Sequence, residues 1–305
     1  MRYHCFIELP KSYRFSKELF NATIPISVNG VSGKLLMPDY IDDIINEYGD
    51  LYNKNTLKEK KYAGHEDSFY YHLTNFYCEF YNDENIDRDA FYNNIKYTLN
   101  AFFDLLECYP KKNECNNVST HTTKSNKFKF SLIPENEKPI SRLHFSGDIW
   151  SDCSNNINNC INRYTLLRLL QLIKYNAKPI LEFLLLREAK DMLENKNNRY
   201  VIINCCTICE IVFSKLLVDK LTKNGSKKED IEKILNNING IVALRMLLKE
   251  FKINTIKSDF FVLAKLRNKA AHMGISPTVE ECNEYIKDCE ALLKFHRIKF
   301  YEIEK

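Results

Sequence analysis

The first part of the chain alternates apolar and polar residues in the manner of β-strands. Residues 3–9 are rich in aromatic and β-branched side chains, and Pro10 is expected to end their strand, because proline cannot donate to a sheet ladder. Residues 69–81 hold seven aromatic side chains between acidic flanks, which favours a packed strand over a surface that stacks nucleic-acid bases. Further strands are predicted over 127–133 and 142–150.

A hairpin is predicted around Asn29-Gly30, a dipeptide that strongly favours a two-residue turn between strands. Residues 23–28 alternate before it, and residues 31–37 supply the return strand. The segment 30–34, Gly-Val-Ser-Gly-Lys, also invites comparison with a phosphate-binding loop. Its spacing is wrong, and Leu35 stands where such a loop needs Ser or Thr to bind magnesium, so a hairpin is the better interpretation.

Helical signals in this part of the chain are few. Apolar residues recur at helical spacing over 89–106, and a shorter helix is predicted over 40–48. Residues 113–126 are polar and turn-forming, which is typical of a loop. Together with the strands, these segments predict a β-rich α+β domain over 1–150, which is an ordinary size for one domain.

The pattern changes after residue 150, where the β-signals end. Residues 151–162 include five asparagines and are expected to form a linker or an exposed loop. Residues 164–194 follow one long helical pattern, which Pro179 is expected to kink or divide. Residues 200–222 predict a second long helix that is apolar on most sides, and Gly225 is expected to stop it.

Shorter helical patterns complete the chain, over 230–235 and 241–251. Ser258 or Asp259 can cap a helix that runs to residue 273. Thr278 and Glu281 have the spacing of a capping box for a last helix that runs to about residue 300. The expected fold class is therefore α+β, with an all-α helical bundle over 163–305 after the β-rich domain.

Composition narrows the class of protein only modestly. The net charge of +4 allows a nucleic-acid partner without demanding one. The eleven cysteines are scattered, and the N-terminal residues lack the apolar core of a secretion signal, so reduced thiols and a cytoplasmic location are expected. The longest apolar run, 200–213, is broken by Asn204 and Glu210 and is too short and too polar to predict a membrane span.

The helix that runs to residue 273 carries the candidate chemistry. One apolar stripe is predicted along it: Leu263, Leu266, Ala270 and Met273. Asn268 and His272 are four residues apart and share a face, whereas Arg267 and His272 differ by about 140° around an ideal helix. Arg267 and His272 would meet only through the long reach of arginine, a distorted helix end or a second copy of the chain.

These residue types suit RNA cleavage. A histidine can take the proton of the ribose 2′-hydroxyl or protonate the leaving 5′-oxygen, and such transfers contribute roughly 10² to 10⁴ in rate. Arg267 is always charged and matches phosphate oxygens in pairs, and Asn268 can hold the imidazole or the phosphate. The structural alternative is that His272 only complements the helix dipole, while Arg267 pairs with an acidic neighbour such as Glu210.

The Arg-Asn-x-x-x-His pattern, on a late helix of an all-helical segment, resembles the motif of the HEPN family over roughly 163–300. In that family, an Arg-x(4 to 6)-His motif carries ribonuclease activity that needs no metal or other cofactor. The resemblance implies that Arg267 and His272 are catalytic and that Asn268 assists. It also implies a homodimer in which two motifs face one cleft, so that two histidines and two arginines surround one scissile phosphate.

Two further positions bear on this resemblance. Glu210 resembles an acidic position that is common on the second helix of HEPN domains, and a buried glutamate needs a partner, for which Arg267 is a candidate. Glu210 is therefore expected to be a supporting residue. HEPN domains paired with nucleotidyltransferase antitoxins often carry a modified tyrosine two residues after the histidine. This chain has Gly274 there, which argues against that mode of regulation.

Other clusters are better explained by structure. Cys206-x-x-Cys209 suggests a metal site, but zinc usually needs a second close pair, and the cysteines of the last helix are seven residues apart. These cysteines are expected to be small core residues, and no metal ligand is predicted. His144 and Asp148 are expected to belong to a strand and the turn after it.

The overall layout, a β-rich front domain before a HEPN-like bundle, resembles that of ApeA-type phage-defence proteins. It implies a sensor or regulator over 1–150 and a ribonuclease over 163–305. We therefore expect a cytoplasmic, homodimeric endoribonuclease that cleaves tRNA or mRNA in anti-phage defence (abortive infection) or as a toxin, under a phage-derived trigger or a separate antitoxin. The alternative is a catalytically silent HEPN module that binds RNA or a protein partner.

Overall fold

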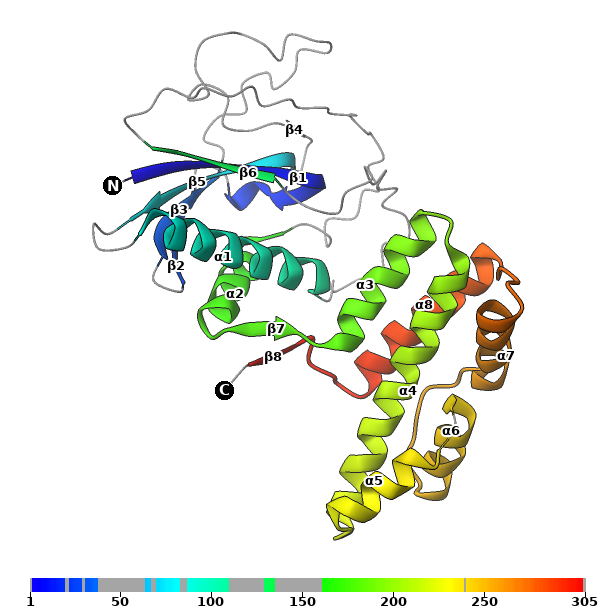
Figure 1. Ribbon diagram of the computed structural model, residues 1–305. Helices are drawn as coiled ribbons and strands as arrows, with labels where there is room; N and C mark the ends of the chain where they lie inside the picture. Colours follow the sequence, from blue (N-terminus) through cyan, green and yellow to red (C-terminus); the bar gives the residue numbers. More distant parts are fainter. Residues whose placement is uncertain are drawn as a thin grey trace. The chain divides into compact units, whose positions relative to one another are not determined.

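The computed structural model describes residues 2–19, 22–28, 31–37, 64–66, 70–82, 87–109, 129–134, 161–238 and 240–303. Contacts divide the chain into two compact units, Met1–Lys178 and Pro179–Glu302, and Ile303 returns to the first unit. An antiparallel sheet precedes a mostly helical part, which confirms the predicted α+β class (Figure 1). Several predictions lie outside the described residues, namely the segments 40–48, 113–126 and 142–150 with His144 and Asp148.

One sheet in the described part of the first unit is built from six strands. Their bounds are β1 Arg2–Ser16, β2 Thr23–Val28, β3 Val31–Leu36, β4 Gly64–Glu66, β5 Tyr70–Tyr81 and β6 Lys129–Pro134. The strand order is β2-β3-β5-β1-β6, with β4 also paired to β5, and every pairing is antiparallel. A short 3₁₀ helix, Lys17–Leu19, follows β1.

The predicted hairpin is confirmed by its two strands. β2 and β3 pair in register from Val28 opposite Val31 to Thr23 opposite Leu36, while the Asn29-Gly30 turn itself lies outside the described residues. Gly33 is a strand residue: a Cβ at this position would lie 2.3 Å from the carbonyl oxygen of Glu79 in β5. The glycine therefore allows β3 and β5 to approach each other closely.

The expectation that Pro10 ends the first strand is wrong. β1 continues to Ser16, but its pairing with β5 shifts register between Glu8 and Tyr13, and its pairing with β6 stops at Glu8. Pro10 falls inside this irregular interval, where a missing N–H removes no ladder hydrogen bond. A proline is tolerated in a strand at such a position.

Two α-helices lie in the described residues of the first unit, α1 Arg88–Cys108 and α2 Arg163–Lys174. Asp87 caps α1, whose buried face includes Phe91, and the Phe91 ring lies 5.1 Å from the ring of Tyr3 in β1. α2 packs against α1 and β2. The contacts therefore place α2 with the sheet, whereas the sequence pattern assigns it to the helical bundle.

The long pattern over 164–194 is divided, as the presence of Pro179 predicts. α2 ends at a turn in which Asn176 has a φ of 53°, and the short strand β7, Ala177–Pro179, separates it from α3, Leu181–Glu194. An extended segment replaces a continuous helix here because proline disfavours helical backbone at the residue before it.

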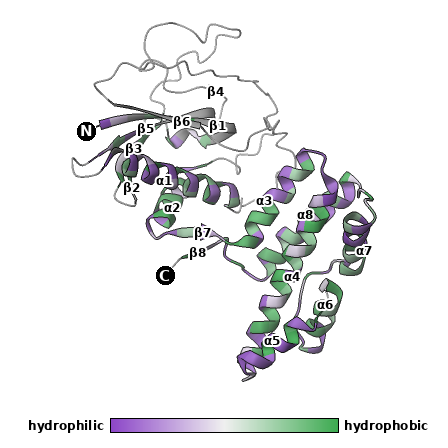
Figure 2. Ribbon diagram, viewed as in Figure 1, coloured by the Kyte–Doolittle hydropathy of each residue, from purple (hydrophilic) through white to green (hydrophobic). Residues whose placement is uncertain are grey.

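The second unit is organised around one long helix. Its elements after α3 are α4 Asn198–Lys223, α5 Lys228–Asn236, α6 Gly240–Glu250, α7 Phe260–His272, α8 Val279–Phe295 and the strand β8 Tyr301–Ile303, which pairs with β7. α4 packs against all five of the other helices of the unit. Figure 2 shows apolar residues along most of its length, and ten of them are buried. These contacts make α4 the centre of the core.

The helix ends follow the predicted signals with one exception. Gly225 stops α4 with a φ of 83°, and Thr278 and Glu281 form the predicted capping box of α8. The last helix ends at Phe295 rather than near residue 300, because Arg297 adopts a φ of 53°. The Ile298 N–H then donates to the carbonyl of Leu293 at 3.0 Å, which closes the helix end.

α4 is also apolar enough to raise the question of a membrane. Of the described helices, it is the one that is both long and apolar enough to cross a bilayer, with an 18-residue window of mean hydropathy 2.0. The apolar segment is thus longer than the run 200–213 suggests. Half of that window is buried among the other helices, and the central helix of a bundle meets the same test of length and composition.

Candidate active site at the end of helix α7

α7 begins at a well-defined cap. The Asp259 side chain accepts hydrogen bonds from the backbone N–H groups of Phe261 and Val262, both at 3.1 Å. Ser258, the other predicted cap, instead donates to Asp288 of α8. The cap satisfies two of the donors that every helix start leaves without a partner and so fixes where α7 begins.

Few residues of α7 face the core. Phe260, Leu263 and Ala270 are buried, and the Phe260 ring meets Phe213 of α4 edge-on at 5.0 Å. The predicted apolar stripe therefore holds at two of its four positions. Leu266 is half-buried, and Met273 is 68% exposed because it forms the C-cap, where the chain leaves the helix.

Asn268 and His272 of the motif lie on the outer side of α7, whereas Arg267 lies on the side of the buried residues Leu263 and Ala270. Asn268 and His272 are exposed, and Arg267 is half-buried. Arg267 donates a hydrogen bond from Nη1 to Oδ1 of Asn268 at 3.0 Å. His272 has no hydrogen bond or ion pair with any described residue, and α7 is a regular helix as far as His272. Within one chain, Arg267 and Asn268 are therefore hydrogen-bonded, and His272 forms no hydrogen bond with either of them.

An exposed stripe runs along the same side of α7. Phe261, Lys265, Asn268 and His272 are spaced by four, three and four residues, which places them in one line on a helix. The Lys265 ammonium lies 4.4 Å from the centre of the Phe261 ring. Other large apolar side chains of α7 and of the segment after it are also exposed, namely Val262, Met273, Ile275 and Val279. This part of the unit thus combines Asn268 and His272 with uncovered apolar surface.

Glu210 lies on α4, where the sequence predicts a buried carboxylate that needs a partner, with Arg267 as a candidate. The structure leaves Glu210 half-buried, with its Oε1 3.7 Å from the thiol of Cys206. Among the described residues, Glu210 forms no ion pair with Arg267. Burial is the main cause that raises the pKa of the Cys206 thiol, and the neighbouring charge of Glu210 raises it further. The charge of Arg267 lowers this pKa. Glu210 and Arg267 thus both act electrostatically on Cys206.

The beginning of α4 holds the end of α7, a contact that sequence reasoning missed. Arg199 donates from Nε to the carbonyl of Ala270 at 3.0 Å, and Asn198 donates from Nδ2 to the carbonyl of Pro277 at 2.9 Å. Gly274, with a φ of 70°, ends the helix between these two carbonyls. Local sequence patterns carry no signal for this contact, because Arg199 and Ala270 are 71 residues apart.

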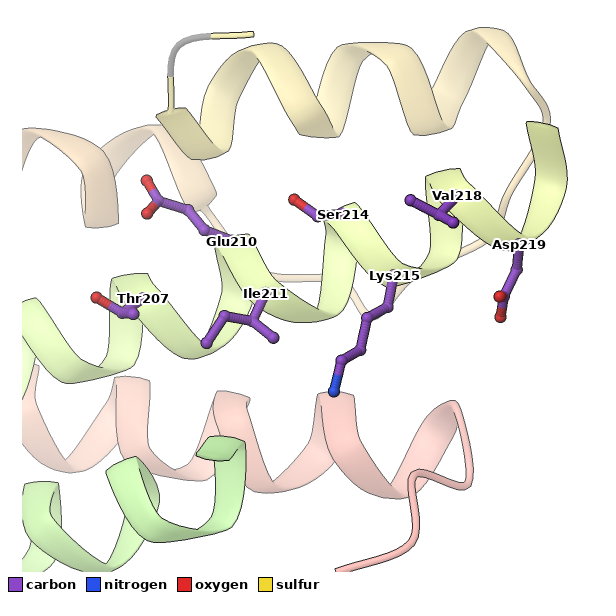
Figure 3. Close-up of a pocket in the computed structure, with 7 residues that line it drawn as sticks. All are labelled: Thr207, Glu210, Ile211, Ser214, Lys215, Val218 and Asp219. Atoms are coloured by element: carbon purple, nitrogen blue, oxygen red, sulfur yellow. The ribbon is translucent and has the colours of Figure 1, made fainter. Parts of the chain in front are cut away.

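A groove of about 420 Å³ opens along another side of α4 (Figure 3). Its lining consists of Thr207, Glu210, Ile211, Ser214, Lys215, Val218 and Asp219. Of the predicted site residues, Glu210 alone is among these described lining residues. Lys215 points away from the line of Ser214 and Val218, and its Nζ lies 2.6 Å from Oε1 of Glu182, a fully buried residue of α3.

The cysteines of the second unit are core residues, as the sequence predicts. All five are buried: Cys205, Cys206, Cys209, Cys282 and Cys289. The sulfur atoms of Cys209 and Cys289 lie 3.9 Å apart where α4 packs against α8. Hydrogen bonds to neighbouring cysteines and burial raise the pKa of the Cys289 thiol. In the part of the chain that is described, the side chains of Cys, His, Asp and Glu form no group of three that could hold a metal.

Comparisons with known proteins do not identify the chain. No family model, no curated protein and no solved structure matches it.

Proposed function

We propose that the chain is an endoribonuclease of the HEPN type that cleaves RNA without a metal ion, at a site completed by a second copy of the chain. The observation that carries this proposal is helix α7, which exposes Asn268 and His272 together with apolar side chains and on which the half-buried Arg267 donates to Asn268. The motif resemblance supplies the chemistry, and the exposure of Asn268 and His272 makes them accessible to RNA.

The proposed reaction moves two protons and exchanges one bond. A base removes the proton from the ribose 2′-hydroxyl, and the 2′-oxygen attacks the neighbouring phosphorus. The bond from phosphorus to the 5′-oxygen breaks, and an acid protonates that oxygen. The products are a 2′,3′-cyclic phosphate and a 5′-hydroxyl. His272 supplies the base or the acid, and the Arg267 guanidinium stabilises the charge on the phosphate oxygens.

A second copy of the chain supplies what one copy lacks. Within one chain, Arg267 donates a hydrogen bond to Asn268, and no hydrogen bond joins Arg267 to His272 among the described residues. Two copies related by a two-fold axis along the α7 ends would place two arginines and two histidines around one phosphate. Burial of the exposed Phe261, Val262 and Met273 would contribute to such an association.

The proposed setting is a cytoplasmic response to infection. The first unit, with its sheet, would restrain the nuclease until a phage-derived trigger or the loss of an antitoxin releases it, and tRNA or mRNA would be the substrate. This setting rests on the resemblance of the chain's layout to that of ApeA-type defence proteins.

The deciding experiment is cleavage of labelled RNA by the full-length protein in EDTA, and His272→Ala is the first variant. We expect 2′,3′-cyclic phosphate ends and a loss of at least about 10²-fold in rate in the variant, since proton transfer contributes that much. His296→Ala is the matched control. His296 is the C-cap of α8 and lies far from the candidate site. The start of α8 is the part near that site, since Cys282 contacts Asn198, and His296 is 14 residues, or about 21 Å along the helix, beyond Cys282.

Two further measurements, the melting temperature and the mass in solution, accompany the cleavage assay. His272 is exposed, so His272→Ala should leave the melting temperature unchanged. Sedimentation at micromolar concentration should show a dimer, and a monomer that still cleaves RNA would contradict the shared site. Cleavage that persists in His272→Ala would contradict the assignment of the catalytic residue.

A binding module without catalysis is the second candidate. It is favoured by the absence, among the described residues of one chain, of a hydrogen bond between Arg267 and His272. Such a module would bind RNA or a protein partner equally well before and after His272→Ala, and the wild type would leave labelled RNA intact.

A further inference from the structure

The first turn of α4 and the last turn of α7 are joined by one cationic side chain. Helix α7 leaves its last four carbonyl groups without partners inside the helix, and the carbonyl of Ala270 is one of them. Arg199 donates to it from Nε at 3.0 Å. The guanidinium is thereby fixed beside the turn that carries His272, only two residues beyond Ala270.

The geometry of this contact leaves most of the guanidinium free to bind something else. Nε is used by the Ala270 carbonyl, while the two terminal nitrogen atoms of Arg199 have no partner among the described residues. Arg199 is exposed, and so are Lys269 and His272 on the facing turn. A side chain already held at one nitrogen loses less freedom when it binds a ligand, so its remaining donors are suited to a second acceptor.

Charge indicates which acceptor fits. The C-terminal end of a helix carries a partial negative charge of about half an elementary charge, which repels an anion. A phosphate that approaches His272 meets this end of α7. The fixed positive charge of Arg199 lies at the same place and offsets the repulsion, and Lys269 adds to it. Its two free nitrogen atoms match two oxygens of one phosphate group.

We propose that Arg199 binds a backbone phosphate of single-stranded RNA at the end of α7 and so places the RNA against His272. The inference rests on the proposed function and adds a substrate-binding residue from α4 to a motif that lies wholly on α7.

The test is the salt dependence of RNA binding by the full-length protein. The probe is a labelled single-stranded RNA with 2′-O-methyl riboses, which cannot be cleaved, and binding is followed by fluorescence anisotropy at several salt concentrations. For single strands, each phosphate contact contributes about 0.7 to the slope of log affinity against log salt concentration. We expect Arg199→Gln to weaken binding and to reduce the slope by about that amount.

Matched variants separate charge from structure. Lys223→Gln removes one positive charge from the exposed last turn of α4, about 36 Å from Arg199 along the helix, and should keep the wild-type slope. Arg199→Lys keeps the charge and should restore most of the slope. Arg199→Gln retains an amide donor for the Ala270 carbonyl and lies at an exposed position, so it is expected to fold, which circular dichroism verifies.

The outcomes distinguish this inference from the proposed function. If the wild type neither binds nor cleaves RNA, both are rejected. If the wild type cleaves RNA while Arg199→Gln keeps the wild-type slope, the inference alone is overturned. In that case, slower cleavage would assign Arg199 to holding the end of α7 without contact to RNA.

Discussion

Helices α4 and α7 belong to the same unit but use their side chains in opposite ways. α4 buries ten residues around its circumference, and α7 buries three on one side. Some polar groups on α4 have partners in the core, as in the Lys215–Glu182 pair and the Cys206–Glu210 contact. On α7, Asn268 and His272 face solvent. The difference indicates that α4 determines whether the unit folds, while the outer side of α7 remains available for chemistry.

The largest expected effect comes from an aromatic residue of α4. Phe213 is fully buried and packs edge-on against Phe260, so Phe213→Ala should lower the free energy of unfolding by about 3–5 kcal/mol. Phe261 is adjacent to Phe260 but 56% exposed within one chain, so Phe261→Ala should cost the monomeric chain less than about 1 kcal/mol. Urea unfolding of both variants measures the difference.

The second variant of this pair also bears on function. If Phe261→Ala destabilises the protein as much as Phe213→Ala does, the outer side of α7 is part of a packed interface in solution. The comparison between the two helices would then apply to the isolated chain alone.

The ion pair between Glu182 of α3 and Lys215 of α4 should lose different amounts of unfolding free energy when one or the other residue is replaced. Lys215→Met leaves the fully buried carboxylate of Glu182 without its counter-charge and should cost about 2–3 kcal/mol, a value reduced because the Lys215 side chain is 53% exposed. Glu182→Gln leaves a lysine that can turn to water and should cost about 1 kcal/mol. Thermal unfolding of the two variants at equal pH tests the order, and a larger cost for Glu182→Gln would contradict it.

The smallest expected effect concerns the glycines that end α4 and α7. Gly225 after α4 and Gly274 after α7 have φ values of 83° and 70°, and a Cβ added at either position would meet no other atom within 4 Å. Alanine at each should therefore cost a similar amount, about 1 kcal/mol, through backbone strain alone. Only Gly274→Ala should also slow RNA cleavage, because it strains the turn after His272. Equal activity in the two variants would show that this turn does not position the site.

The sequence predicted the elements of the second unit well where the signals were local. Helical periodicity, the Thr278 and Glu281 capping box and the stop at Gly225 all depend on residues within one or two turns of each other. The prediction at Pro10 was wrong because a strand tolerates proline where the neighbouring strands form no ladder hydrogen bond with it. The sequence of one strand does not reveal where its neighbours pair. The grouping of α2 with the sheet is likewise a matter of tertiary contacts.

The candidate site was only partly accessible from the sequence. The motif residues come from the resemblance to the HEPN motif, and the angle that separates Arg267 from His272 follows from helix geometry. The sequence did not predict the hydrogen bond between Arg267 and Asn268. The charged carboxylate of Glu210 was the expected partner of Arg267, because a carboxylate is a stronger acceptor than an amide oxygen. Arg199 was missed because its place beside Ala270 results from the packing of α4 against α7.

The pairing of β7 with β8 has a mechanical consequence. These strands lie where the chain enters and leaves the second unit, and the Ile180 N–H adds a hydrogen bond to the carbonyl of Phe300 at 3.1 Å. Tension applied to the chain on both sides of this unit would load the hydrogen bonds between β7 and β8 first. The helices from α3 to α8 would carry no force until those bonds broke, so the bundle is shielded from pulling at its ends.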